Sequence, residues 1–257
     1  MRGALTIAGK DLRNIFASPL FYVLAGICSI VWSLLFLLAV EEFANRSLMQ
    51  MAVPPEQQQG MSLHFTIIAR HLSLVNLLLV FSVSALTMRL FTEEKKNRTF
   101  DLLLTSPVTA TEIALGKWMA GTVTAWALVL LSALYPLSIL PFAQLEWGLL
   151  FSSYFGLLLL VMVYVAVGVF ASSLTESAVL AVIMALVFNI MLWFVGAAGE
   201  SADGAIARAT FDQLNVGTHF IEFVKGSVSI AGIVYFASAT FLFTLLTERV
   251  IESFRWR

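Results

Sequence analysis

The sequence is poor in charge. Only 12% of its 257 residues are Asp, Glu, Lys or Arg, and 60% are hydrophobic, whereas soluble domains carry about 25% charged residues. This deficit places the chain among membrane proteins. Its 15 basic residues nearly balance its 16 acids, giving a net charge of −1. Such a chain has no field to attract nucleic acid, so a nucleic-acid partner is excluded.

Several common signatures are also missing. The one cysteine, Cys28, lies in an apolar run and cannot form an intramolecular disulfide. The first 16 residues contain no apolar core before a small-residue cleavage site, so we expect no cleaved signal peptide. The sequence has neither an H-E-x-x-H zinc motif nor a G-x-x-x-x-G-K-[ST] phosphate loop. We therefore expect no catalytic, cofactor-binding or metal-binding residues in this chain.

Long apolar runs are what the sequence does contain. A membrane-spanning helix needs about 20 mostly apolar residues, and lipid requires such segments to satisfy their own backbone hydrogen bonds. The pattern predicts an all-α polytopic membrane protein, a single domain over residues 1–257, with six spans. The spans are expected at about 20–40, 71–90, 118–141, 148–171, 178–198 and 227–247. None of them contains Asp, Glu or Lys, and Arg89 is their one arginine.

The distribution of Lys and Arg predicts the orientation. If both termini are cytoplasmic, eleven basic residues lie inside: Arg2, Lys10, Arg13, Arg89, Lys95, Lys96, Arg98, Lys117, Arg249, Arg255 and Arg257. Four then lie outside: Arg46, Arg70, Arg208 and Lys225. This excess predicts cytoplasmic termini and a cytoplasmic location for the charged segment at 93–98.

The segments flanking the spans are expected to be helical or polar. Residues 1–19 predict a helix along the inner membrane surface, ending before Ser18-Pro19. Its apolar face comprises Leu5, Leu12, Ile15 and Phe16, opposite Lys10, Arg13 and Asn14. On the outer side, residues 41–70 carry a flexible tip, "VPPEQQQG". Residues 199–226 predict short re-entrant or interfacial helices that bring together Phe211, Leu214, Phe220 and Phe223.

Two other functions were considered. A secondary transporter usually buries acids or histidines in its spans, but these spans have no acid, and His64, His71 and His219 are better explained as interfacial residues. The segment "ESADGAIARATFDQLNVG" is similar to the start of the CDP-alcohol phosphotransferase signature. That signature requires two further aspartates where this chain has Ile221 and Lys225, and Glu200 replaces its leading Asp. Such a site would not hold a divalent metal.

Residues 93–117 contain more structure than a connection between spans needs. Phe100, Leu103 and Leu104 have the i, i+3, i+4 spacing of a short amphipathic helix that ends before Pro107. Thr109 and Glu112 form a T-x-x-E capping box for a second helix. We expect Phe100 and Leu103 to form an exposed apolar knob that needs a partner surface; the alternative is an ordinary membrane-edge anchor.

This segment resembles the cytoplasmic loop of ABC-2 type permeases, the membrane subunits of one class of ABC transporters. In that family an acidic-basic run precedes G-T-x-E-x-L-L-x-x-P, followed by a helix start and a Gly-Lys pair. The matching residues are Glu93, Glu94, Lys95, Lys96, Thr99, Asp101, Leu102, Leu103, Pro107, Gly116 and Lys117. The chain departs from the pattern at Arg98, usually Gly, and at Asp101, usually Glu. The likeness covers nearly the whole chain and is greatest to the GldF-like gliding-motility branch, with NosY-type permeases next.

The resemblance implies a bacterial inner-membrane protein and several partners. A separate ATPase subunit would bind ATP and Mg, and a second permease copy would form a homodimer or heterodimer. A protein with a large periplasmic domain is a further candidate partner. Residues 92–117 would be the coupling helix, with Glu93, Glu94, Lys95, Lys96, Thr99, Phe100, Asp101, Leu102, Leu103 and Pro107 contacting the ATPase. The loop at 172–177 could touch the same partner.

Two functions remain open for such a permease. It could couple ATP hydrolysis to export of a substrate, or it could pass ATP-driven motion to an outer partner and conduct nothing, as in gliding motility. Export requires a path between two copies, with candidate lining residues Asn76, Ser82, Ser84, Thr122, Thr124 and Asn189. Most of these are better explained by hydrogen bonding between helices, worth about 0.6 kcal/mol each.

Overall fold

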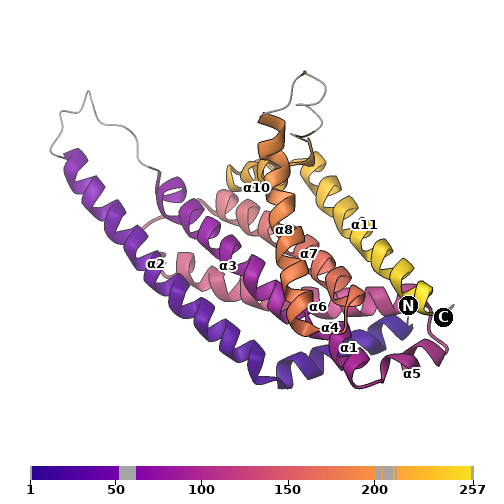
Figure 1. Ribbon diagram of the computed structural model, residues 1–257. Helices are drawn as coiled ribbons and strands as arrows, with labels where there is room; N and C mark the ends of the chain where they lie inside the picture. Colours follow the sequence, from indigo (N-terminus) through magenta and orange to yellow (C-terminus); the bar gives the residue numbers. More distant parts are fainter. Residues whose placement is uncertain (1, 52–61, 201–203, 205–210, 212, 256–257) are drawn as a thin grey trace.

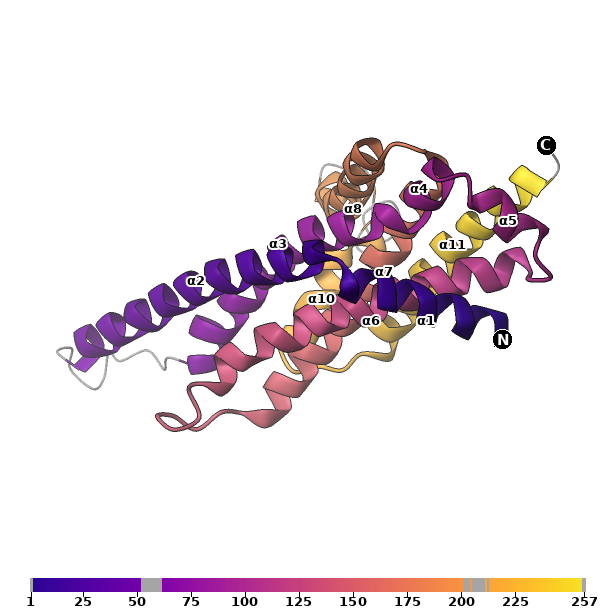
Figure 2. The same cartoon turned by 90° about the horizontal axis from the view of Figure 1, so that it is seen from below.

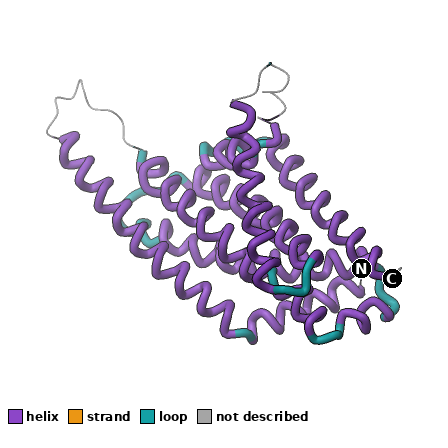
Figure 3. The backbone as a smooth tube through the Cα atoms, viewed as in Figure 1, coloured by secondary structure: helices purple, strands orange, loops and turns teal. Residues whose placement is uncertain are grey.

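The computed structural model describes residues 2–51, 62–200, 204, 211 and 213–255, and every regular element among them is helical (Figures 1 and 3). Six of these helices are long and apolar enough to cross a membrane: Pro19–Gln50, His64–Lys96, Ala110–Leu137, Trp147–Leu174, Ala178–Val195 and Ile230–Arg255. The prediction of an all-α fold with six spans is confirmed. The second span is longer than predicted because α4 continues α3 beyond residue 90.

The helices follow one another with short connections. In chain order they are α1 (Arg2–Ala17), α2 (Pro19–Met51), the π-helical turn η2 (His64–Ile68), α3 (Ala69–Thr87), α4 (Arg89–Lys96), α5 (Phe100–Thr105), α6 (Ala110–Leu137), α7 (Trp147–Leu174), α8 (Ala178–Glu200), α10 (Val216–Val224) and α11 (Ile230–Arg255). The start of α1 and the end of α11 lie at the same end of the molecule, close to α5 (Figure 1).

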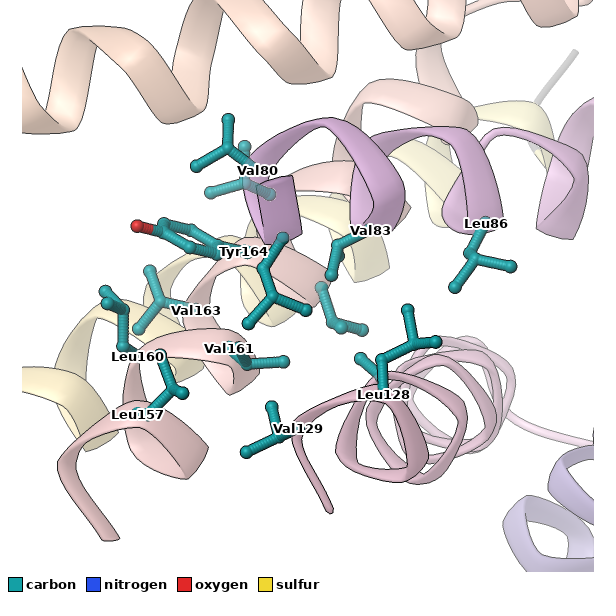
Figure 4. Packing of buried hydrophobic residues seen from close by; sticks show 14 of the residues in the cluster. Val80, Val83, Leu86, Leu128, Val129, Leu157, Leu160, Val161, Val163 and Tyr164 are labelled. Carbon is teal, nitrogen blue, oxygen red and sulfur yellow. The ribbon is translucent and has the colours of Figure 1, made fainter. Parts of the chain in front are cut away.

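Helix α7 lies at the centre and contacts α3, α6, α8, α10 and α11. Branched aliphatic side chains of α3, α6 and α7 form the core, including Val83, Leu128 and Leu160 (Figure 4). Small residues bring these backbones close together, as is usual between membrane helices. At Gly168 of α7, a side chain would collide with Thr87 of α3.

The outer helices are much less buried. Most of the apolar stretch of α7 is covered by other helices, whereas α2, α8 and α11 leave most of theirs exposed. Helix α2 lies along one edge of the molecule (Figures 1 and 2). In a bilayer these apolar faces contact lipid or another protein chain.

Helix α1 ends at Ala17, as predicted, and the face that packs on the protein is not the one predicted to lie on the membrane. The residues buried are Ala4, Ile7, Ala8 and Asp11, and α1 packs along α6, whereas Leu5 is 60% exposed. The approach is close because α6 has no side chain at Gly116: a Cβ there would lie 2.8 Å from the carbonyl oxygen of Ala4. Helix packing, which amphipathic spacing does not reveal, therefore decides the face.

The predicted outer segments are described only in part. Helix α2 continues to Met51, and "VPPEQQQG" lies outside the described residues, as do most of residues 201–212. Within 199–226 the structure places α10 against α7, with Phe220 and Phe223 buried. Leu214 is 49% exposed.

Candidate functional site

The segment from α4 to the start of α6 is a helical hairpin at the end of the molecule where the termini lie (Figure 2). Helix α4 stops at Lys96, α5 spans Phe100–Thr105, and α6 begins at Ala110. The capping box predicted at this start is confirmed: Glu112 N donates to Thr109 Oγ1 at 3.2 Å, and Thr109 N donates to Glu112 Oε2 at 3.4 Å. Local sequence thus specifies the turn between α5 and α6.

Arg98 ends α4 in a strained conformation. Thr99 N donates to the carbonyl of Glu94 at 2.9 Å, and Arg98 N donates to that of Lys95 at 3.1 Å, the two bonds of a Schellman motif. This motif needs a left-handed residue, and Arg98 has φ 57°. Glycine is favoured there because a Cβ is penalised in this region. The departure from the family pattern at position 98 thus falls on the one non-glycine residue, among those the structure describes, with a positive φ.

The structure corrects the predicted apolar knob. Phe100 is only 5% exposed. Its ring packs edge-on against Phe91, at 6.0 Å between centroids, and against Phe254 of α11, at 5.7 Å. Lys95 Nζ lies 5.5 Å from the Phe100 centroid and 4.4 Å from that of Phe254. Phe100 therefore turns inward because the end of α11 covers it, and it is not the exposed residue of α5.

The exposed side of α5 is formed by other predicted residues. Leu102 is 70% exposed, and Asp101, Thr105 and Pro107 are exposed as well. Leu103 is half-buried against the core. The outward apolar residue of the hairpin is therefore Leu102.

A buried charge cluster joins α1, α4 and α6. Lys117 Nζ is fully buried and lies 2.8 Å from Glu94 Oε2 and 3.1 Å from Asp11 Oδ2. Lys10 Nζ contacts Glu94 Oε1 at 2.8 Å, and Lys117 Nζ also lies 4.8 Å from the Phe91 ring centroid. Two cations and two carboxylates balance, as a buried group of this kind requires. We name this set (Lys10, Asp11, Glu94, Lys117) the α1–α4–α6 charge cluster.

Burial and partners set the pKa values on the α1 side of this cluster. Desolvation raises the pKa of Asp11, helped by the nearby Glu94 charge and opposed by Lys117. The hydrogen bond to Glu94 raises the pKa of Lys10. Sequence reasoning singled out Glu94 and Lys117 through the family pattern but missed Asp11. The available signal was an acid on the otherwise apolar buried face of residues 4–11.

Further contacts tie the hairpin to the spans. Lys95 Nζ donates to the carbonyl of Ser173 at the end of α7, at 2.5 Å. Arg255 of α11 donates to the carbonyl of Val108 at 2.5 Å, and Thr111 donates to Glu248 at 2.9 Å. Ser172, in the second predicted partner loop, accepts from Phe91 N at 3.1 Å. The hairpin therefore contacts α1, α7 and α11.

The six candidate path-lining residues all lie inside the helix bundle of one copy: Asn76, Ser82, Ser84, Thr122, Thr124 and Asn189. Asn76 Oδ1 accepts from Tyr164 Oη at 2.8 Å, and Ser82 Oγ lies 3.0 Å from Cys28 Sγ. Ser84 and Thr124 bond to carbonyls of their own helices. Hydrogen bonding explains these four, whereas Thr122 and Asn189 have no side-chain partner among the described residues.

No group of three His, Cys, Asp or Glu in the described part of the chain could hold a metal ion. Most of the segment similar to the phosphotransferase signature lies outside the described residues. His64 and His71 are buried and bond to the carbonyls of Val224 and Ser132, which is a packing role rather than an interfacial one.

Comparison with known proteins identifies one family. The family described as ABC-2 family transporter protein matches residues 5–250. No curated protein is similar to the chain at a significant level. The family match covers nearly the whole chain, including the hairpin and all six spans.

Proposed function

Because the chain belongs to the ABC-2 family of transporter membrane proteins and is thus a permease subunit of an ABC transporter, we propose that its hairpin couples ATP hydrolysis in a separate subunit to movement of a substrate across the membrane. The ATPase binds to the hairpin, residues 92–117. The observation that carries this proposal is the exposed Leu102 of α5, a helix that Phe100 packs against Phe91 of α4 and Phe254 of α11. An exposed apolar side chain on a fixed support is typical of a contact residue.

The anchoring supports a role in transmitting force. The α1–α4–α6 charge cluster holds α4 against α6 from within, while Phe100 joins α5 to Phe254 of α11. A rigid element of this kind moves as a unit when a partner pushes on it. Motion of a bound ATPase would thus reach α3 through α4, and α11 directly.

The remaining parts of the proposal follow from the family and the topology. The ATPase binds ATP and Mg, and both termini and the hairpin face the cytoplasm of a bacterial cell. A second permease copy covers exposed apolar surface of α2 and α8, the least buried spans together with α11. The branch, an outer partner and the substrate are matters for experiment, and the family match gives no support to a purely force-transmitting role.

Co-purification with the ATPase tests this proposal. We expect Leu102→Ala to weaken ATPase binding at least about fivefold, because truncation of a hot-spot contact costs more than about 1 kcal/mol. Leu5→Ala is the matched control, since Leu5 is similarly exposed, at 60% against 70%, and lies on α1. If both variants recover the ATPase equally, the proposal that it binds at α5 is contradicted.

A further inference from the structure

A second charged feature lies beside the hairpin, between α4 and the start of α8. It is a cavity of about 860 Å³. Its charged lining comprises the cations Arg89, Lys95, Lys96 and Arg98 and the acids Glu93 and Glu176. Four positive charges against two negative ones leave an excess of two. Glu93, Lys95, Lys96 and Arg98 belong to the hairpin, but the cavity lies on its α4 side, whereas the ATPase contact proposed above is at Leu102 of α5.

Two of the four cations are already engaged. Arg89 pairs with Glu93 at 3.4 Å, and Lys95 donates to the carbonyl of Ser173. Among the described residues, the side chains of Lys96 and Arg98 form no ion pair and no hydrogen bond, and both are exposed. The cavity thus has two cations available for an anion.

The backbone at Arg98 adds an independent observation. A left-handed arginine costs stability that a glycine would recover, and such strain persists where the side chain has a use. Here the strained residue supplies a guanidinium to the cavity. The planar guanidinium fork suits phosphate oxygens.

The surroundings of the cavity are apolar on one side. Met88 and Val179 also line it, and Val179 is 70% exposed. Leu180 and Ile183 continue an exposed apolar face along α8, which is a candidate membrane span. An amphipathic ligand would place its anionic group among the cations and its chains along α8. The first turn of α8 adds the favourable end of a helix dipole.

We propose that this cavity binds the phosphate group of an anionic phospholipid, with Lys96 and Arg98 as its ligands. The site lies at the end of the second and fifth spans, where headgroups lie. This inference requires only that the chain be inserted in a membrane. Because Lys96 and Arg98 belong to the hairpin, lipid binding is measured on the chain without an ATPase, so the two proposals fail separately.

The test uses the full chain purified in detergent. Binding of phosphatidylglycerol, phosphatidylcholine and inorganic phosphate is measured by native mass spectrometry and thermal stability. We expect phosphatidylglycerol to bind about tenfold more tightly than phosphatidylcholine. A basic residue near an anionic headgroup contributes roughly a factor of five, so Arg98→Gly and Lys96→Gln should each reduce the preference about fivefold.

Arg98→Gly also separates binding from folding. Without lipid, its melting temperature should equal or exceed that of the wild type, because glycine relieves the left-handed strain. Arg13→Gln is the matched control: Arg13 is an exposed cation of α1 outside the cavity, and its replacement should leave the lipid preference unchanged.

Three results would overturn the assignment. Equal loss of preference in Arg13→Gln would show a diffuse surface charge effect instead of a site. Stabilisation by inorganic phosphate as great as by phosphatidylglycerol would show that the ligand is the free anion. If the wild type binds both lipids equally, the cavity is not a site for anionic lipid, and an acidic protein partner becomes the alternative ligand.

Discussion

Lys117 of α6 pairs with one acid of α1 and one acid of α4. It is fully buried between Asp11 and Glu94. Replacing it by Met would leave two carboxylates close together without their shared cation, and breaking a buried pair in this way usually costs about 3–5 kcal/mol. We therefore expect Lys117→Met to lower the free energy of unfolding by roughly this amount, measured by denaturation in micelles.

Asp11→Asn is the control for that variant. It leaves Lys117 paired with Glu94, so we expect a clearly smaller loss of stability. The double variant with Lys117→Met should recover part of the loss, because the one remaining carboxylate, Glu94, still pairs with Lys10. A Lys117→Met protein that unfolds at the wild-type midpoint would contradict this description of the cluster.

The pH dependence of stability gives a second test of the α1–α4–α6 charge cluster, at Asp11. Burial raises the pKa of Asp11 above its ordinary value of 3.8, so the folded state holds this proton more tightly than the unfolded state. The contribution is fully present below pH 3.8 and is lost as the pH rises through the folded-state pKa. Wild type should therefore lose stability relative to Asp11→Asn as the pH rises from 3.8, measured by paired melting curves; a constant difference would contradict the shift.

At the scale of elements, α5 depends on a contact that is distant in sequence. Phe100 is covered by Phe254 of α11, and removing a buried Phe side chain typically costs about 3–5 kcal/mol. Phe100→Ala should therefore loosen α5 locally, with faster hydrogen exchange over residues 98–108 and unchanged exchange in α7. Leu102→Ala should weaken ATPase binding without faster exchange. Identical exchange in both variants would argue against the inward role of Phe100.

The contrast between α5 and the start of α6 shows what sequence can predict. Thr109 and Glu112 are three residues apart, so their capping box follows from local spacing. The partner of Phe100 is 154 positions away, and no periodicity in residues 100–104 indicates which side α11 will cover. The same holds for Asp11 and Lys117, which meet across 106 positions. The long apolar runs predicted the six spans because a run of this length satisfies its own backbone hydrogen bonds in lipid as a helix.

At the scale of the whole molecule, the chain is expected to depend on its partner for energy. No phosphate loop occurs in its sequence. The purified chain should therefore show no measurable affinity for ATP, tested by equilibrium binding with labelled nucleotide. Binding of nucleotide by the chain alone would contradict the proposal that a separate subunit binds and hydrolyses ATP.

The contact between the hairpin and the ATPase is the central claim, and site-specific crosslinking in membranes tests it most directly. Cys28 is replaced by Ser, and single cysteines are introduced at Leu102 or at Phe142. Phe142 is 89% exposed and lies in the turn between α6 and α7, at the opposite end of α6 from the hairpin. A short thiol-directed crosslinker should join position 102 to the ATPase and leave position 142 unlinked. Crosslinking from 142 with none from 102 would contradict both the proposed ATPase contact and the proposed orientation in the membrane.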